Sequence, residues 1–267
     1  LRFDDRGVGK STGIFKTAGI MDFRDDVICA FMYLQNQPNI DKNKIGVLGH
    51  SLGGAIVALV ENELNGKINF VISLAGPGDT GYNICLKQSE DINRSEGMPD
   101  QEIEKKLLDI RKVLDLSLTE NTDPEVLTKK IKTLILKSED NKPFIKRFVA
   151  KLKIFLEMIF SKGLFEIYTH VWFKEFLTFN PETAWTKVRC RVLLLNGGLD
   201  LQVDSSNLNL IEQYLRNGGN NQVTIKLFPR MNHLFQMTDK GSLDEYSKIK
   251  TGISEDVLSF IANWILN

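Results

Sequence analysis

One serine of the chain stands in a setting that could make its hydroxyl a nucleophile. Ser51 is the centre of a G-x-S-x-G motif that runs from Gly49 to Gly53, between two apolar stretches. We expect a sharp turn from a strand into a helix here, and side chains at 49 and 53 would collide with the neighbouring strand and helix. Such a turn exposes the hydroxyl of Ser51 and places the backbone N–H of Leu52 where an oxyanion develops.

A serine hydroxyl needs a base within hydrogen-bond reach, and the chain has three histidines. His50 lies inside the motif, where its side chain should point away from that of Ser51. His170 lies among aromatic residues, and we expect it to be a packing residue. His233 follows an apolar run and should lie on a loop, so we predict that it is the base; a surface loop histidine is the alternative.

The base needs an acid that fixes its tautomer and stabilises the imidazolium. Asp200 follows an apolar run and two glycines, so we expect it on the turn that leaves a strand, where ligands of parallel sheets gather. Asp204 is the rival, and its expected role is to cap the helix that follows. We predict that Asp200 is the acid.

The sequence gives little support for nucleotide binding or metal binding. Gly9-Lys10-Ser11 resembles the end of a phosphate-binding loop, but Asp4 stands where that motif needs a glycine. The three cysteines are widely spaced and match no metal-ligand pattern, and we expect them to be small buried apolar residues. We therefore predict no metal and no organic cofactor.

The composition narrows the class of partner. With 34 basic and 34 acidic residues the net charge is zero, so no bulk field directs the chain to nucleic acid or to an anionic membrane. No apolar run reaches the roughly 18 residues that a membrane span needs. The basic, aromatic stretch 144–160 is interpreted as a lid helix over the site, with a membrane-surface helix as the alternative.

Apolar runs and helical periodicities alternate along much of the chain. Strands are expected at 44–48, 69–75, 190–195 and 222–228, and helices at 22–36 with Asp22 as N-cap, after Ser51, and at 254–266 with Ser254 as N-cap. The expected strands are apolar throughout, as burial on both faces requires. The fold class predicted is therefore α/β, a parallel sheet covered by helices on both faces.

Residues 86–185 follow a different pattern. No strand is expected there, and helical spacing covers 101–116, 124–136 and 144–160. We predict that 1–85 and 186–267 form the core and that 86–185 is an inserted helical cap.

These features together resemble the α/β-hydrolase superfamily, and more narrowly its bacterial esterase and serine-aminopeptidase-like branch. Its members carry serine, acid and histidine in that order, as Ser51, Asp200 and His233 do. The likeness extends to LAGPG, MNHLFQ and the closing EYSKIKTGISEDVLSFIANWI. The opening DDRGVGKSTG is similar to a segment after the fourth strand of that branch, with Asp5, Arg6, Gly7, Gly9 and Ser11 in part of it.

The resemblance also implies an N-terminal truncation. If LRFDDRG ends the family's fourth strand, strands one to three and the loop that gives the second oxyanion N–H are absent from this chain. We then expect an open sheet edge at 44–48 and half of an oxyanion hole. Removing one such donor typically costs about 10²–10³ in rate.

The activity that the resemblance implies is hydrolysis of a small-molecule carboxylic ester through an acyl-enzyme. A thioesterase, an acyltransferase or a peptidase would use the same residues. A catalytically impaired fragment or a binding protein on a hydrolase scaffold is the alternative of another class. We expect no nucleic-acid partner and no stable membrane insertion; the sequence predicts neither a compartment nor an oligomeric state.

Overall fold

A computed structural model of the chain describes all residues except 120–122 and 139–165. Its centre is a sheet of four parallel strands in the order β1-β2-β3-β4. The strands are β1 (Val47–His50), β2 (Phe70–Leu74), β3 (Arg191–Gly197) and β4 (Val223–Phe228). The prediction of a parallel α/β sheet is confirmed. The first strand begins three residues later than expected, because Lys42–Lys44 form a 3-10 turn.

The sheet is apolar on both faces because successive side chains of a strand point to opposite sides. Val71 and Leu194 lie in the cluster on one face, where α1 (Ile20–Gln35), α2 (Leu52–Leu64), α8 (Pro181–Trp185) and α9 (Asn207–Asn217) pack. Ile72 and Leu193 lie in the cluster on the other face, which α11 (Glu255–Leu266) covers. Two-sided burial thus explains why the central strands are apolar without alternation.

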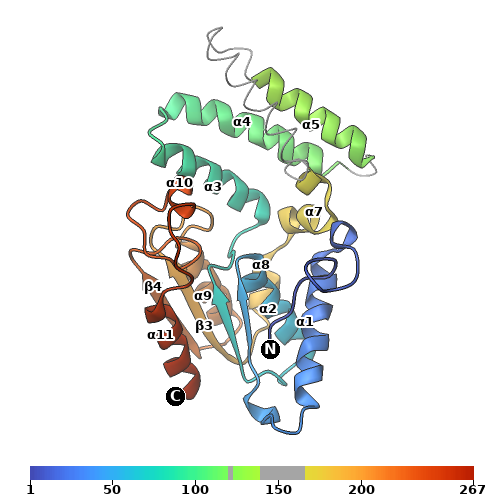
Figure 1. The fold of residues 1–267 in the computed structure, drawn as a ribbon, viewed down its shortest axis with the longest axis vertical. Helices are drawn as coiled ribbons and strands as arrows, with labels where there is room; N and C mark the ends of the chain where they lie inside the picture. Colours follow the sequence, from blue (N-terminus) through green and yellow to red (C-terminus); the bar gives the residue numbers. More distant parts are fainter. Residues whose placement is uncertain (120–122, 139–165) are drawn as a thin grey trace.

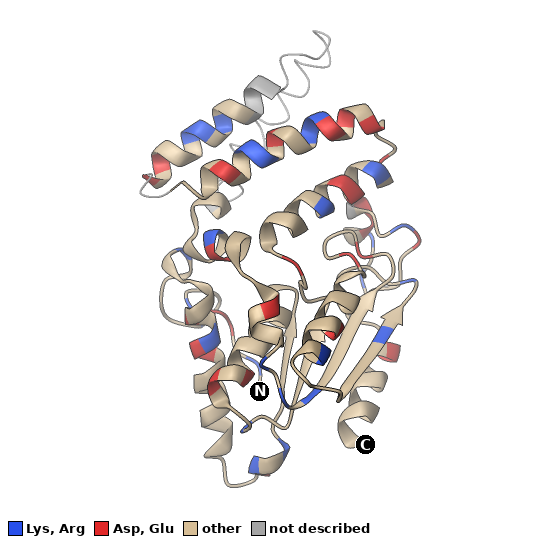
Figure 2. Ribbon diagram, turned by 180° about the vertical axis from the view of Figure 1, so that it is seen from behind, with Lys and Arg blue, Asp and Glu red and all other residues tan. Residues whose placement is uncertain are grey.

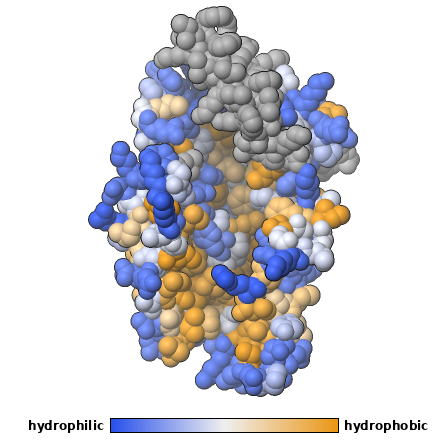
Figure 3. Space-filling view, in the orientation of Figure 1, coloured by the Kyte–Doolittle hydropathy of each residue, from blue (hydrophilic) through white to orange (hydrophobic). Residues whose placement is uncertain are grey.

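The two outer strands are less buried than the central pair. In the part of the chain that the structure describes, β1 pairs only with β2, as the expected open edge requires, and Leu48 is 49% exposed. On the opposite edge, β4 leaves Leu227 exposed. Figure 3 shows hydrophobic residues lining a hollow in the middle of this face of the molecule.

A group of helices stands above the carboxyl ends of the strands (Figure 1). It contains α3 (Gly81–Ser95), α4 (Asp100–Ser117), α5 (Pro124–Ser138) and α7 (Val171–Thr178). Leu114 and Phe173 belong to one small apolar cluster there, and Leu127 and Ile131 to another. Figure 2 shows basic and acidic residues mixed along these helices. The expected helix at 144–160 lies outside the described residues.

Two expectations about helix α1 are wrong. The helix begins at Ile20 rather than at Asp22, with Gly19 as N-cap, and the carboxylate of Asp22 reaches back to accept from Gly19 N at 2.8 Å. Cys29 is exposed rather than buried, because it lies one turn after exposed Asp25 on the solvent face. Cys85 and Cys190 are half-buried.

The remaining short elements complete the chain. Helix α10 (Leu243–Tyr246) lies between β4 and α11, and 3-10 turns occupy Phe15–Thr17 and Glu166–Thr169. Ser254 stands at the N-cap position of α11, as expected. Among the described helices none is both long and apolar enough to cross a membrane.

Replacing Leu194 by alanine should test the role of the central strands. Leu194 is fully buried, so Leu194→Ala should lower the free energy of unfolding by about 2–5 kcal/mol. Leu227→Ala on the exposed side of β4 is the matched control and should change it far less. Urea unfolding of both variants measures the difference; equal effects would contradict the assigned core.

Candidate active site

Ser51 occupies the tight turn that the motif predicts. Strand β1 ends at His50 and helix α2 begins at Leu52, so Ser51 alone joins them. Its backbone has φ 55° and ψ −124°, a conformation that non-glycine residues rarely adopt and that costs on the order of 1–3 kcal/mol. Ser51 N donates to Leu74 O at 2.8 Å, which ties the turn to the neighbouring strand.

The glycines around Ser51 do not all serve the purpose expected of them. A Cβ at Gly49 would overlap the carbonyl group of Gly53, so a side chain is excluded there. A Cβ at Gly53 would meet nothing within 4 Å, so the expected collision at that position is wrong. The second crowded position is Gly54, whose Cβ would lie 2.7 Å from Ser73 Oγ and 2.8 Å from Gly76 Cα. Helix α2 therefore packs closely against strand β2 at Gly54.

The start of helix α2 supplies a backbone donor beside Ser51. Leu52 is the first residue of the helix, and the first N–H groups of a helix have no partner within it. The positive end of the helix dipole also favours negative charge at this point. The predicted oxyanion donor, the Leu52 N–H, thus has the setting that such a donor needs.

Asp200 is held in one orientation by three hydrogen bonds. Its side chain is fully buried on the turn after β3. Oδ1 accepts from Gln202 N at 2.8 Å and from Val203 N at 2.9 Å, while Oδ2 lies 2.8 Å from His233 Nδ1. Because a carboxylate only accepts, Nδ1 of His233 carries the proton, and Nε2 of the neutral ring is left as an acceptor.

The loop after β4 carries His233, which is 4% exposed. Asn232 shapes this loop, because its Oδ1 accepts from Leu234 N and Gln236 N, each at 3.0 Å. Phe235 is fully buried and has φ 55°, so its ring anchors the loop beneath the site. The surface-loop alternative for His233 does not fit its burial.

The two rejected candidates lie elsewhere. Asp204 Oδ1 accepts from Ser206 N at 2.9 Å, but Ser206 and not Asp204 is the N-cap residue of α9, so the expected cap assignment is wrong by two residues. His170 stands at the start of α7, where its Nδ1 accepts from Trp172 Nε1 at 3.2 Å.

The structure joins two of the three predicted residues directly. His233 and Asp200 are paired, whereas among the hydrogen bonds of the described residues none links Ser51 to His233. His50, the residue before Ser51, packs its ring against that of His233, with ring centroids 4.6 Å apart. Hydrogen bonds between such a serine and its base often tighten only when substrate binds.

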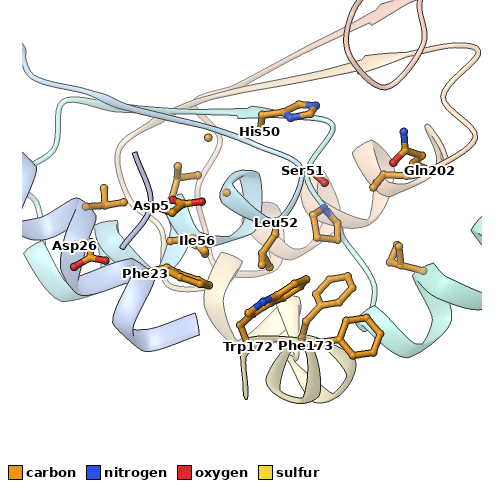
Figure 4. A pocket seen from close by; sticks show the side chains of 18 of the residues that line it. Asp5, Phe23, Asp26, His50, Ser51, Leu52, Ile56, Trp172, Phe173 and Gln202 are labelled. Atoms are coloured by element: carbon orange, nitrogen blue, oxygen red, sulfur yellow. The ribbon is translucent and has the colours of Figure 1, made fainter. Parts of the chain in front are cut away.

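A cavity of about 560 Å³ opens beside Ser51. Trp172 and Phe173 of α7 lie across it from Ser51 and Leu52 (Figure 4). Most of its lining is apolar: Phe15, Phe23, Val27, Val47, Leu48, Ile56, Val57, Ile84, Ile167 and Phe176. Gln202 provides a polar group near Ser51 (Figure 4).

His50 and Gln202 are site residues that the sequence reasoning missed. His50 was set aside as a base, but its Nε2 lies 2.8 Å from the carbonyl oxygen of His233. Gln202 donates its backbone N–H to Asp200 and its side-chain amide to Tyr246 Oη at 3.2 Å. The spacing of Gln202 after Asp200 could have suggested the first bond, since aspartate commonly accepts from the N–H two residues on.

The described residues offer no cluster of metal ligands. Within residues 1–119, 123–138 and 166–267, no three or more His, Cys, Asp or Glu side chains are grouped so that they could hold a metal ion. The thiols of Cys85 and Cys190 are poor nucleophiles, because burial raises the pKa of Cys85 to about 11 and that of Cys190 to about 12.

One family model matches part of the chain. Residues 29–154, just under half of the chain, match the sequence model of the family described as BAAT / Acyl-CoA thioester hydrolase C terminal. The match includes the turn at Ser51 and ends before Asp200 and His233. The search of curated proteins found no match.

Solved structures with some likeness include three hydrolases. An esterase from Exiguobacterium antarcticum is 13% identical with a TM-score of 0.49, over 98% of this chain and 79% of that one. A monoacylglycerol lipase from Paleococcus ferrophilus is 15% identical with a TM-score of 0.46, over 96% and 79%. Dipeptidyl peptidase 4 from Porphyromonas gingivalis is 12% identical with a TM-score of 0.45, over 94% and 23%.

The extent of these likenesses is limited. The chain spans 23% of the Porphyromonas peptidase and 59% of an esterase from Pyrococcus furiosus. The TM-scores are low, so the assignment of the fold depends on the parallel sheet, the turn at Ser51 and the His233–Asp200 pair.

Alanine at the two glycines of the motif should have opposite consequences. Gly49→Ala forces a Cβ into the carbonyl of Gly53 and should strongly destabilise the turn. Gly53→Ala enters open space and should change stability by no more than about 1 kcal/mol, the difference in helix propensity. Urea unfolding checks both; a Gly49→Ala protein as stable as the wild type would contradict the geometry.

Asparagine at Asp200 should impair the nucleophile. Asp200→Asn removes the charge that fixes the His233 tautomer and should slow covalent labelling of Ser51 by a fluorophosphonate roughly 10²–10⁴-fold. Asp204→Asn keeps an acceptor for Ser206 N and is the matched control, with labelling near the wild-type rate. The labelling is followed by mass spectrometry. Equal slowing in both variants would contradict the assignment of the acid.

Proposed function

We propose that this chain, a member of the α/β-hydrolase superfamily, hydrolyses carboxylic esters through an acyl-enzyme on Ser51. One observation carries the proposal: a buried His233–Asp200 pair, joined at 2.8 Å, lies on the loops that follow β4 and β3, at the end of the sheet where Ser51 follows β1. The carboxyl ends of three of the four strands, β1, β3 and β4, thus carry the proposed nucleophile, acid and base.

In the first half of the reaction the serine is acylated. Nε2 of His233 takes the proton of Ser51 Oγ as the oxygen attacks the acyl carbonyl, and Asp200 stabilises the imidazolium. The backbone N–H of Leu52 donates to the carbonyl oxygen as it becomes negative. The C–O bond to the alcohol then breaks, and the alcohol leaves with the proton from His233.

In the second half water releases the acid. His233 takes a proton from water, whose oxygen attacks the acyl carbon of the ester on Ser51. The bond between Ser51 Oγ and the acyl carbon breaks, and the proton returns from His233 to Oγ. The carboxylic acid leaves, and the site is restored. The complete cycle consumes one ester and one water, and every proton transfer passes through His233.

The cavity supports an apolar acyl group as the substrate. Its lining is mostly aliphatic and aromatic, and burial of apolar substrate surface contributes about 25 cal/mol per Å². Ile84 of α3 and Trp172 of α7 form the side opposite the sheet. We therefore propose that the helical segment predicted at 86–185, together with the start of α3, acts as a cap that selects the acyl group.

A thioester is the second candidate substrate. The match of residues 29–154 to a family described by acyl-CoA thioester hydrolysis favours it. The chemistry on Ser51 would be the same, because only the leaving group changes from an alcohol to a thiol. Acyl transfer and peptide cleavage would also use this serine, with another acceptor or another leaving group.

Turnover of a short-chain p-nitrophenyl ester tests the proposal. The chain should hydrolyse the ester, and Ser51→Ala should reduce the rate to background. Parallel assays with the matching acyl-CoA thioester and an aminoacyl p-nitroanilide rank the substrate classes by kcat/KM. A folded chain without Ser51-dependent turnover of any of the three would overturn the proposal.

A further inference from the structure

His50 touches the proposed base at two points. Its Nε2 lies 2.8 Å from the backbone carbonyl oxygen of His233. A carbonyl oxygen only accepts, so Nε2 of His50 carries the proton and donates it. The two imidazole rings also lie against each other, with centroids 4.6 Å apart and planes inclined by 48°. The ring of Phe235 also lies near that of His50, with ring centroids 6.4 Å apart.

We propose that His50 is a positioning residue that holds His233 in place for Ser51, an inference that rests on the proposed function. Asp200 fixes Nδ1 of the His233 ring, whereas His50 fixes the backbone of the same residue and one face of its ring. Both the side chain and the backbone of His233 are thus held by hydrogen bonds. Since His50 adjoins Ser51 in the chain, the hydrogen bond also sets the separation between base and nucleophile.

The sheet topology explains why such a link is needed. Strand β1, which ends at His50, and strand β4, which leads to His233, are opposite edges of the sheet with β2 and β3 between them. The loop after β4 must therefore reach across two strands to bring its histidine to Ser51. The Asn232 hydrogen bonds shape the loop internally but do not attach it to β1. His50 makes that attachment.

The charge of His50 suits this role. Burial lowers the pKa of His50, and the neighbouring His233 ring lowers it further, against the opposing effects of the hydrogen bond to the His233 carbonyl and of Asp200. A neutral His50 has one N–H, which the His233 carbonyl uses. It therefore adds no positive charge beside the ring that must accept the proton of Ser51.

Nε2 of His50, the nitrogen that contacts His233, cannot act as the base in place of His233. Its Nε2 already carries a proton and points to a carbonyl, and Figure 4 shows its ring directed away from the aromatic side of the cavity. A packing role alone would require the ring but not the N–H. The two roles can be separated by substitution.

Two substitutions divide the ring from the donor. His50→Gln keeps an N–H donor near the position of Nε2 and removes the ring, whereas His50→Phe keeps the ring and removes the donor. We expect His50→Phe to lower kcat for the p-nitrophenyl ester by about tenfold, the effect of losing one hydrogen bond. KM should stay near the wild-type value, and His50→Gln should recover most of kcat.

A spectroscopic measurement reports the position of the base directly. The proton on Nδ1 of His233 has an NMR resonance that depends on its hydrogen bond to Asp200. This resonance should move or broaden in His50→Phe and stay near its wild-type position in His50→Gln. Thermal unfolding is the control for a general loss of structure. Such a loss would lower the melting temperature of both variants and would reduce kcat equally in both, which would contradict the positioning role.

The outcomes separate this inference from the proposed function. If the wild type turns over the ester in a Ser51-dependent way, and His50→Phe keeps both kcat and the His233 resonance, the positioning role is wrong. The same holds if His50→Gln loses as much kcat as His50→Phe. If the wild type itself has no Ser51-dependent turnover, the proposed function fails, and an unchanged resonance in His50→Phe would still refute the positioning role separately.

Discussion

A buried carboxylate is costly unless its oxygens are hydrogen-bonded, and Asp200 satisfies this requirement within the turn after β3. Two backbone N–H groups hold Oδ1, so Oδ2 is left for Nδ1 of His233 at 2.8 Å. That one bond sets the tautomer of the ring and leaves Nε2 as the acceptor. The proposed nucleophile Ser51 and the Leu52 N–H, the proposed oxyanion donor, follow β1 at the same end of the sheet, beside the apolar cavity.

The sequence predicted the features that depend on local chain geometry. Four strands, the turn at Ser51 and the loop positions of Asp200 and His233 follow from apolar runs and from the glycines beside them. Such patterns are readable because burial on both faces of a parallel sheet leaves a continuous apolar run in each central strand. The His233–Asp200 bond was an inference from order along the chain, and the structure brings these two residues together.

Features that depend on contacts between distant segments were not predictable. The crowding at Gly54 was not foreseen because it comes from Ser73 on β2 and from Gly76 just after that strand. At the start of α1 the local bond from Gly19 N to Asp22 is joined by a distant one, because the carboxylate of Glu175, 155 positions away, accepts from Ile20 N. His50 was dismissed because nothing in its neighbours signals that a loop from the far edge of the sheet ends on it.

The proposed reaction requires that Ser51 carries the acyl group. Mixing the chain with an excess of a p-nitrophenyl ester, quenching in acid within the first turnovers and mapping the peptides by mass spectrometry tests this directly. The proposed mechanism predicts an acyl adduct at Ser51 and none in Ser51→Ala. An adduct on another residue, or ester turnover that survives in Ser51→Ala, would contradict it.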